Sequence, residues 1–530
     1  MKRILVILLS LLLLLTGCSA LGNGSDYTPY DEMVYARPMP EVMAALLAEC
    51  CETAREEKGF QEVLSAVFDY YDAYDRFYTN YNLAYIEYCR DVTNEYWAEE
   101  VAFCMEYANT VEAGLEELYM ALAESPVRTK LEGVYFGEGF FEAYDGEAVW
   151  DEGFLALLNR ESELIEEYYA LCAETETEEF GSEEYYDRYA DGLCQVLIDL
   201  VLLRQDLADY VGYDSYAGFA YDFYHYRDYT PEQAEAYMTA IRDAMAPLYR
   251  AAWDTDVWEV GWNQGEDMYS YVRTCAKKMG GLVWEAFTRM DRAKLYDIAH
   301  SPLKYGTSFE VYLSSYQCPY IFVSPTGYGV DNLTFAHEFG HFVTDYAVDG
   351  GSWAGTDVLE VFSQGMEYLS IAYGEANKDL SRYKLADCLS IYVEQSAYAY
   401  FEQLLYALPA EDLTVERLYE LYDQTMLSFG IDYEAMGYDP RDLVNVSHFY
   451  TDPMYIISYV VSNDVAFQLY RMEQEKPGTG LACFERNLTT ECYYLLDFAQ
   501  QAGLENPMAP GRVEAVAAEL ASLLGLNAMT

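Results

Sequence analysis

Residues 331–341 of the chain read Asp-Asn-Leu-Thr-Phe-Ala-His-Glu-Phe-Gly-His, and this segment holds two of only five histidines in 530 residues. Apolar residues recur here at helical spacing, which predicts a helix. Four residues along a helix turn through about 400°, so His337 and His341 project from one face roughly 6 Å apart. Such a pair can bind one zinc ion, and Glu338 beside it can accept a proton from water. Two surface histidines next to an ordinary glutamate are the alternative, which rarely arises in a chain with so little histidine.

A catalytic zinc ion needs a third protein ligand and an open position for water. Metzincins place a glycine and a third histidine where this chain has Thr344 and Ala347, so that class is excluded. The remaining ligand is then a carboxylate further along the chain. Asp357, Glu360 and Glu367 follow at helical spacing, and one can bind the metal while another orients a histidine. The residues alone leave the choice among the three open.

The first residues carry an export signal. Two basic residues precede an apolar run that ends in Leu15-Thr16-Gly17-Cys18 and is too short to span a bilayer of about 30 Å. This ending resembles a bacterial lipobox. We therefore expect residues 1–17 to be a lipoprotein signal peptide, and Cys18 to be lipidated and to anchor the chain outside the cytoplasm at the bacterial cell envelope. An ordinary secretory signal with an incidental cysteine is the alternative.

The composition predicts a folded chain that does not bind nucleic acid. Hydrophobic residues make up 52% and charged residues 23% of the sequence, which gives ample apolar surface to bury. Acidic residues outnumber basic ones by 90 to 31, and the net charge of −59 repels phosphate backbones. The eleven cysteines besides Cys18 form no Cys-x-x-Cys pair, so neither a zinc ribbon nor a disulfide framework is implied.

Most of the chain has the spacing of amphipathic helices. Apolar residues recur every three or four positions in the first part, as in Val63, Val67, Tyr70 and Tyr74. We expect a lipidated cysteine and tether at residues 18–30, a helical region at 31–205 and a catalytic region at 206–530. Thr230-Pro231-Glu232-Gln233 has the residues of a helix start.

One short β element is predicted. Tyr320-Ile321-Phe322-Val323 lies between Pro319 and Pro325, and prolines favour an edge strand. An edge strand could align a peptide by strand addition.

At this point a family resemblance becomes visible. The segment at 331–341, followed by Leu359-Glu360-Val361-Phe362-Ser363-Gln364, resembles the M3 zinc metallopeptidases, the group of thimet oligopeptidase and oligoendopeptidase F. Gly212-Tyr213-Asp214-Ser215-Tyr216-Ala217 is similar to the start of the oligoendopeptidase F catalytic region. His448-Phe449-Tyr450, with Tyr455 and Tyr459 after it, resembles the segment whose histidine and tyrosines stabilise the transition state.

The resemblance implies a fold and a site. It makes Glu360 the third zinc ligand beside His337 and His341, and leaves Asp357 and Glu367 to support the ligands. It also implies that Glu338 acts as the base, that His448 with Tyr455 or Tyr459 stabilises the oxyanion, and that two helical regions of a mostly α fold enclose a deep channel.

The function that follows is that of a zinc-dependent endopeptidase, with one Zn²⁺ per chain, which cleaves short oligopeptides. The alternatives are an inactive surface lipoprotein that binds peptides or metal, and a helical zinc carboxypeptidase.

Overall fold

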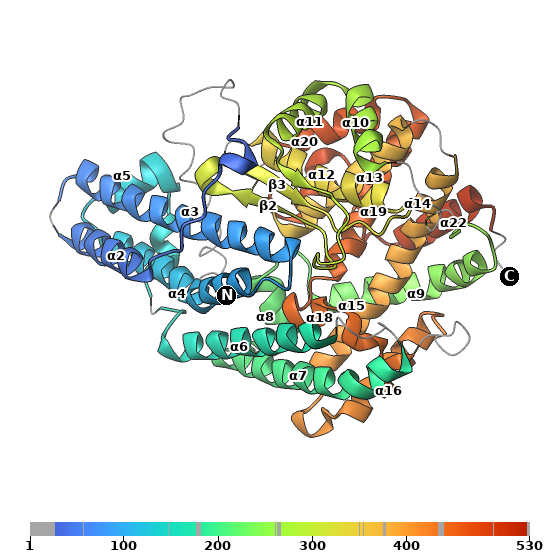
Figure 1. Cartoon of the computed structure of the whole chain (residues 1–530), viewed down its shortest axis with the longest axis horizontal. Coiled ribbons are helices and arrows are strands. Elements are labelled where there is room, and N and C mark those ends of the chain that lie inside the picture. Colours follow the sequence, from blue (N-terminus) through green and yellow to red (C-terminus); the bar gives the residue numbers. More distant parts are fainter. Residues whose placement is uncertain are drawn as a thin grey trace. The chain divides into compact units, whose positions relative to one another are not determined.

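The structure is a computed structural model that describes residues 27–526, except 57, 147, 176–181, 260, 262–266, 349, 353, 375–377, 433–438 and 491. The predicted signal peptide, Cys18 and most of the predicted tether lie outside the described residues. The chain divides into two compact units, whose elements are labelled in Figure 1. The first unit comprises Met1–Glu163, Thr288–Ser324 and Asp345–Trp353, and the second comprises Leu164–Phe287, Pro325–Thr344 and Ala354–Thr530.

These units divide the chain at other places than the predicted boundary between residues 205 and 206. Leu164 to Gln205 belongs to the second unit, and Thr288–Ser324 returns to the first. Three helices cross from one unit to the other along the chain: α6 (Glu152–Thr175), α11 (Gly281–Ala293) and α12 (Asp331–Ala347).

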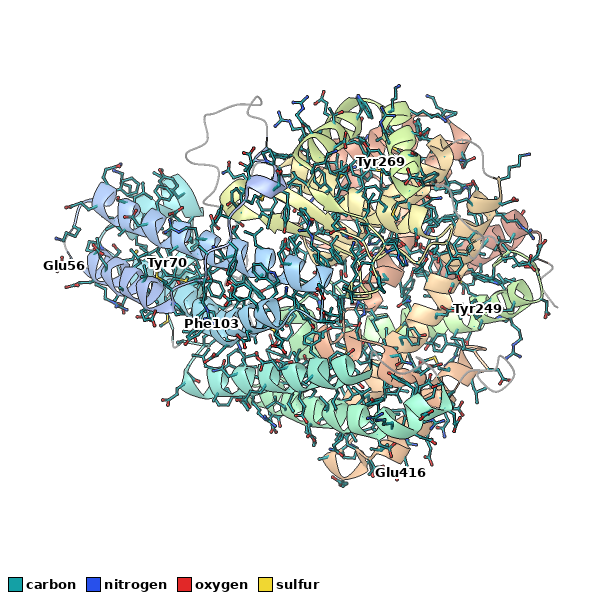
Figure 2. The ribbon with its side chains drawn as sticks, viewed as in Figure 1. Glu56, Tyr70, Phe103, Tyr249, Tyr269 and Glu416 are labelled. Atoms are coloured by element: carbon teal, nitrogen blue, oxygen red, sulfur yellow. The ribbon has the colours of Figure 1, made fainter. Side chains whose placement is uncertain are left out.

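The first unit is built on three long helices. Its other elements are short helical turns and a small sheet. The bounds are η2 (Tyr30–Glu32), α2 (Pro40–Arg55), α3 (Phe60–Arg90), α4 (Glu95–Ala123), α5 (Arg128–Leu131), η3 (Glu132–Phe136), η4 (Phe140–Tyr144), β1 (Tyr296–Asp297), β2 (Phe309–Leu313), η5 (Ser314–Tyr316) and β3 (Cys318–Phe322). The predicted spacing is confirmed in α3, where Val63, Val67 and Tyr70 are buried in the core that α2, α3 and α4 share; Tyr70 is labelled in Figure 2.

The predicted strand exists as β3, but its predicted place at an edge is wrong. The strand order is β1-β3-β2, with β3 parallel to β1 and antiparallel to β2. Pro319 is tolerated in this central strand because the short β1 pairs only with Ile321 and Phe322, beyond the proline. With a neighbour on each side of these two residues, β3 has no free edge there for a peptide.

The second unit consists mainly of helices joined by loops. Its elements are α7 (Glu183–Tyr210), α8 (Tyr216–Phe223), α9 (Pro231–Trp253), α10 (Met268–Met279), α13 (Thr356–Tyr373), α14 (Lys378–Ser390), η6 (Ile391–Gln395), α15 (Ser396–Tyr406), η7 (Ala410–Asp412), α16 (Val415–Ser428), η8 (Pro440–Asn445), α18 (His448–Thr451), α19 (Ile457–Glu475), α20 (Thr479–Asn487), α21 (Leu495–Ala502) and α22 (Arg512–Leu524). The predicted start of α9 is confirmed: Thr230 accepts from the backbone of Gln233, whose side chain accepts from the backbone of Thr230.

The centre of the second unit is the pair α13 and α19, which lie side by side in Figure 1 and pack along their length. Both are buried on more than one face, as expected of helices that are surrounded by others. The mostly helical fold with a small β element is therefore confirmed. Among the described residues no helix combines the length and the apolar character that crossing a membrane would need.

Candidate active site

The predicted histidine pair lies on α12. His337 and His341 stand one turn apart, with ring centroids separated by 5.1 Å, as their spacing predicts. Gly340 lets α13 approach this turn closely. A Cβ at Gly340 would lie 2.6 Å from the Cα of Ser363 and 2.7 Å from the carbonyl oxygen of Phe362, so any side chain here would push the two helices apart.

Close packing brings Glu360 of α13 to both histidines. Its Oε2 lies 3.4 Å from Nε2 of His337, and its Oε1 lies 3.7 Å from Nε2 of His341. One ligand atom from each of the three residues falls within 4.8 Å of the others. Ser363 donates to Oε2 of Glu360 at 2.8 Å, and Tyr455 donates to Oε1 at 2.7 Å. The carboxylate is thus held in place from both sides.

The other two candidate carboxylates on α13 have different surroundings. Glu367 lies 2.8 Å from Nδ1 of His337, where it orients the ring. Asp357 instead accepts from Tyr229 at 2.8 Å and lies 3.5 Å from Arg227. The structure therefore brings Glu367 to a candidate ligand, as expected of a supporting residue, but directs Asp357 toward Arg227 and Tyr229.

The charges in the site favour a bound cation. Burial by itself lowers the pKa of His337, but Glu360 and the hydrogen bond to Glu367 raise it to about 9. Burial lowers the pKa of His341 to about 4. Burial alone would raise the pKa of Glu360, but the two histidines outweigh this effect and hold that pKa below its ordinary value. Glu360 and Glu367 thus place negative charge beside the two histidines, which favours a cation there.

Glu338 is buried and has the properties of a general base. It follows His337 directly on α12, and its side chain lines the same cavity as His337. Burial raises the pKa of Glu338 to about 7. A carboxylate of this basicity can take a proton from an activated water near neutral pH and can return it in a later step.

These residues fit a metal ion. Because Nδ1 of His337 is engaged by Glu367, its Nε2 remains for a metal, and that nitrogen is the one near Glu360. Two imidazole nitrogens and one carboxylate are the ligand set of many catalytic zinc sites, which keep a fourth position open. His337, His341 and Glu360 would hold the ion.

The predicted oxyanion residues lie next to Glu360. Nε2 of His448 lies 3.2 Å from the hydroxyl of Tyr459, and the rings of Tyr455 and Tyr459 are 5.2 Å apart. Burial lowers the pKa of His448, which favours its neutral form. Tyr450, also near His448 in sequence, stacks instead on Tyr168 with ring centroids 4.1 Å apart.

Several buried polar residues hold the backbone of this segment. Arg204, fully buried, donates to the carbonyl oxygens of Phe449 and Tyr450. The ring of His225 lies 2.9 Å from the carbonyl oxygen of Pro453. Glu402 accepts from the backbone nitrogen of Met454, which has a positive φ of 64°.

Arg204, His225 and Glu402 were not predicted from the sequence. A buried charge has no periodic signal that separates it from the many surface charges of amphipathic helices.

One family model and several solved structures are similar to this chain. A family model described as the Peptidase M3 N-terminal domain matches residues 30–146. Among curated proteins, none matches the chain.

Solved structures match most of the chain. An oligoendopeptidase F is similar with a TM-score of 0.82 at 20% identity, over 94% of this chain and 99% of its own. PZ peptidase A, solved with an inhibitor, gives a TM-score of 0.81 at 19% identity, over 93% and 99%. An oligoendopeptidase F from Bacillus anthracis gives 0.78 at 18% identity, over 95% and 99%. The family model and these structures together confirm the resemblance to the M3 peptidases: the chain has an oligoendopeptidase-like fold, and the matches support a peptidase.

Proposed function

We propose that the chain is a zinc-dependent endopeptidase that hydrolyses short oligopeptides. The observation that carries the proposal is the convergence of His337, His341 and Glu360 on one point beside the buried base Glu338. Zinc is the ion of choice because two imidazoles and one carboxylate suit it better than the harder cations.

Each residue of the site has a task in peptide hydrolysis. When bound, zinc supplies a Lewis acid that polarises the scissile carbonyl and lowers the pKa of water to about 7. Glu338 takes the proton of the attacking water and passes it to the nitrogen of the leaving amine. His448 and Tyr459 donate hydrogen bonds to the carbonyl oxygen as negative charge develops on it, and one good donor of this kind contributes roughly 3 to 4 kcal/mol.

Substrate size and location are further parts of the proposal. The family resemblance implies a channel that excludes folded proteins, so the substrates are short peptides. The lipobox-like ending at Cys18 implies a lipid-anchored protein at the bacterial cell envelope, outside the cytoplasm. Radiolabelled palmitate incorporated into the wild type but not into a Cys18→Ala variant would support the anchor; labelling of both would contradict it.

The alternative of an inactive binding protein is disfavoured by Glu338. A protein that only binds peptide or metal has no use for a buried carboxylate of raised pKa next to the histidines. The second enzymatic function to consider is that of a helical zinc carboxypeptidase, which would release single residues from the carboxyl end of a peptide.

The first prediction tests the reaction. Mass spectrometry of a mixed peptide library incubated with the purified protein should show internal cleavage, which disappears with a chelator and returns with zinc. Glu338→Gln keeps the shape of the side chain but removes the base, so kcat should fall by several orders of magnitude while zinc stays bound. Cleavage at full rate after exhaustive chelation would contradict the mechanism, and release of single residues only would favour the carboxypeptidase.

A further inference from the structure

A cavity of about 300 Å³ lies beside the candidate active site, within the second unit. His337 and Glu338 form part of its wall, and α13, α14 and η6 supply much of the rest. This volume is at the lower end of the range for ligand pockets and is large enough for one amino-acid side chain. Because the wall includes His337 and Glu338, its occupant belongs to a residue next to the cleaved bond.

The wall of this cavity combines an apolar part with acidic groups. Val330, Leu333 and Ile391 form apolar surface, while Glu367 and Asp387 bring carboxylates. None of the described residues that line the cavity is a lysine or an arginine. The cavity therefore offers hydrogen-bond acceptors and carboxylate charge, and the described part of its wall has no lysine or arginine side chain to pair with them.

A buried lysine pairs with both of these carboxylates. Lys384 has a fully buried side chain and contacts Oε2 of Glu367 at 2.7 Å and Oδ2 of Asp387 at 2.8 Å. Glu367 also holds His337, so both of its oxygens are engaged. Asp387 keeps 28% of its side chain exposed and meets Lys384 through one oxygen. One lysine thus faces two carboxylates, and Asp387 retains capacity for a second cationic partner.

A second acceptor in the wall points to a ligand that donates hydrogen bonds. Gln364 is 2% exposed, and its Nε2 donates to the carbonyl oxygen of Tyr459 at 3.0 Å. Its Oε1 is buried and has no hydrogen-bond partner among the described residues. A buried acceptor without a donor costs free energy, which a donor entering the cavity would recover.

We propose that this cavity is the subsite for a lysine or arginine side chain of the substrate, and that Asp387 determines its specificity. The inference rests on the proposed peptidase function and adds the kind of residue required next to the cleaved bond. The aliphatic stem of a basic residue packs on Val330, Leu333 and Ile391, as such stems do on apolar surface. Its charged head forms charge-assisted hydrogen bonds with Asp387 and Gln364.

The test uses peptides that differ at one residue. Cleavage sites of the wild type are mapped first, and peptides are then made with lysine, norleucine or glutamate on either side of the cleaved bond. Binding is measured by calorimetry on the zinc-loaded Glu338→Gln protein, which leaves peptides intact, and kcat/KM is measured on the wild type. On one side of the bond, lysine should be favoured over norleucine about tenfold or more in both measurements, and glutamate should be the poorest.

Asp387→Asn should remove most of the lysine preference, so that the ratio of kcat/KM for the lysine peptide to that for the norleucine peptide falls close to one. Asp209→Asn, an exposed position on α7, removes the same charge and should keep the preference. Equal kcat/KM and equal affinity for the lysine and norleucine peptides would overturn the proposed subsite. The kcat/KM comparison uses the wild type alone, so it does not depend on whether a variant folds. Peptide binding with lysine preference but no hydrolysis by the wild type would instead overturn the proposed function and leave the subsite in place.

Discussion

At the scale of single residues, two tyrosines of α19 and its preceding turn have different partners. Tyr455 donates to Glu360 at 2.7 Å, whereas the hydroxyl of Tyr459 lies 3.2 Å from Nε2 of His448. Tyr455 therefore belongs with the candidate metal ligand, and Tyr459 belongs with His448, the proposed oxyanion donor. The sequence left the choice between these tyrosines open because tyrosine supplies 55 of 530 residues.

We predict that Tyr459→Phe and His448→Ala each lower kcat by about 10²- to 10³-fold with little change in peptide binding, because an oxyanion donor acts on charge that develops in the transition state. The double variant should lose hardly more than the worse single variant, since the two side chains act as a pair. Tyr455→Phe should mainly weaken zinc binding. Steady-state kinetics at saturating zinc separates these effects. An unchanged kcat in His448→Ala would show that His448 does not stabilise the oxyanion.

A further prediction concerns the carboxylates of α13. Glu360→Gln should abolish tight zinc binding, because it removes a ligand. Glu367→Gln should weaken zinc binding by about 10- to 100-fold, as is typical when the partner of a ligand histidine is lost. Asp357→Asn should leave the affinity unchanged, because Asp357 contacts Arg227 and Tyr229 instead. Competition titrations with a zinc chelator measure all three, and retention of zinc by Glu360→Gln would show that the ligand assignment is wrong.

The site residues that could be predicted are those whose residue types recur at a fixed spacing in the sequence. His337, Glu338 and His341 are fixed by the helical repeat, and Glu360 by the family resemblance. Lys384 could not be found this way, because its contact with Glu367 joins α14 to α13 and no local pattern records it. Asp387 pairs with Lys384 on the same helix, at a spacing that surface ion pairs also show.

At the scale of elements, the segment from α18 to α19 depends on buried polar support. Glu402 of α15 accepts from the backbone of Met454, and its second oxygen is buried without a partner among the described residues. Burial raises the pKa of Glu402 from 4.5 to about 8. In the folded protein this carboxyl therefore keeps its proton through a pH range in which the unfolded chain releases it.

The sign of the pH effect follows from this shift. Between about pH 4.5 and 8 the folded state binds more protons than the unfolded state, so the contribution of Glu402 to stability falls as the pH rises. Glu402→Gln imitates the protonated form. Between pH 5 and pH 9 its free energy of unfolding should therefore fall by about 2 to 5 kcal/mol less than that of the wild type.

Chemical denaturation at the two pH values checks this, with the exposed Glu411→Gln of η7 as control. An equal pH dependence in the wild type and Glu402→Gln would show that Glu402 ionises normally.

Elements were predictable where the signal is local. The start of α9 follows from four residues, and the apolar repeat of α3 follows from its own sequence. The central place of β3 was not predictable, because it depends on β1, a strand of two residues more than twenty positions earlier. The close contact of α12 with α13 depends on Gly340. This contact was not predictable, because a glycine inside a helix does not show which other backbone packs against it.

At the scale of the whole molecule, the order of the chain does not follow the order of the units. Residues 288–324 join the first unit because β2 packs on α3, more than two hundred residues earlier. Local periodicity cannot reveal such a return, so the predicted boundary between 205 and 206 followed composition alone. The mostly helical class, by contrast, follows from spacing that is present almost everywhere in the sequence.

The net charge of −59 acts on substrates before they reach the site. Charge of one sign raises the local concentration of oppositely charged ligands and their association rate, and salt screens this attraction. A contact inside a small cavity is screened much less. Two sources of preference for basic peptides can therefore be separated by ionic strength.

We predict that lysines placed several residues from the cleaved bond raise kcat/KM at 0.01 M salt, where the Debye length is about 30 Å, and lose most of this effect at 0.15 M, where it is about 8 Å. A lysine next to the bond, facing Asp387, should keep most of its advantage at both salt concentrations. Steady-state kinetics on peptides matched in length and differing only in the position of one lysine measures both effects. The Asp387→Asn variant should retain the salt-dependent part and lose the salt-resistant part. If remote lysines favour cleavage equally at both salt concentrations, the long-range attraction is absent. If the adjacent lysine loses its advantage at 0.15 M salt as the remote lysines do, Asp387 makes no direct contact with it.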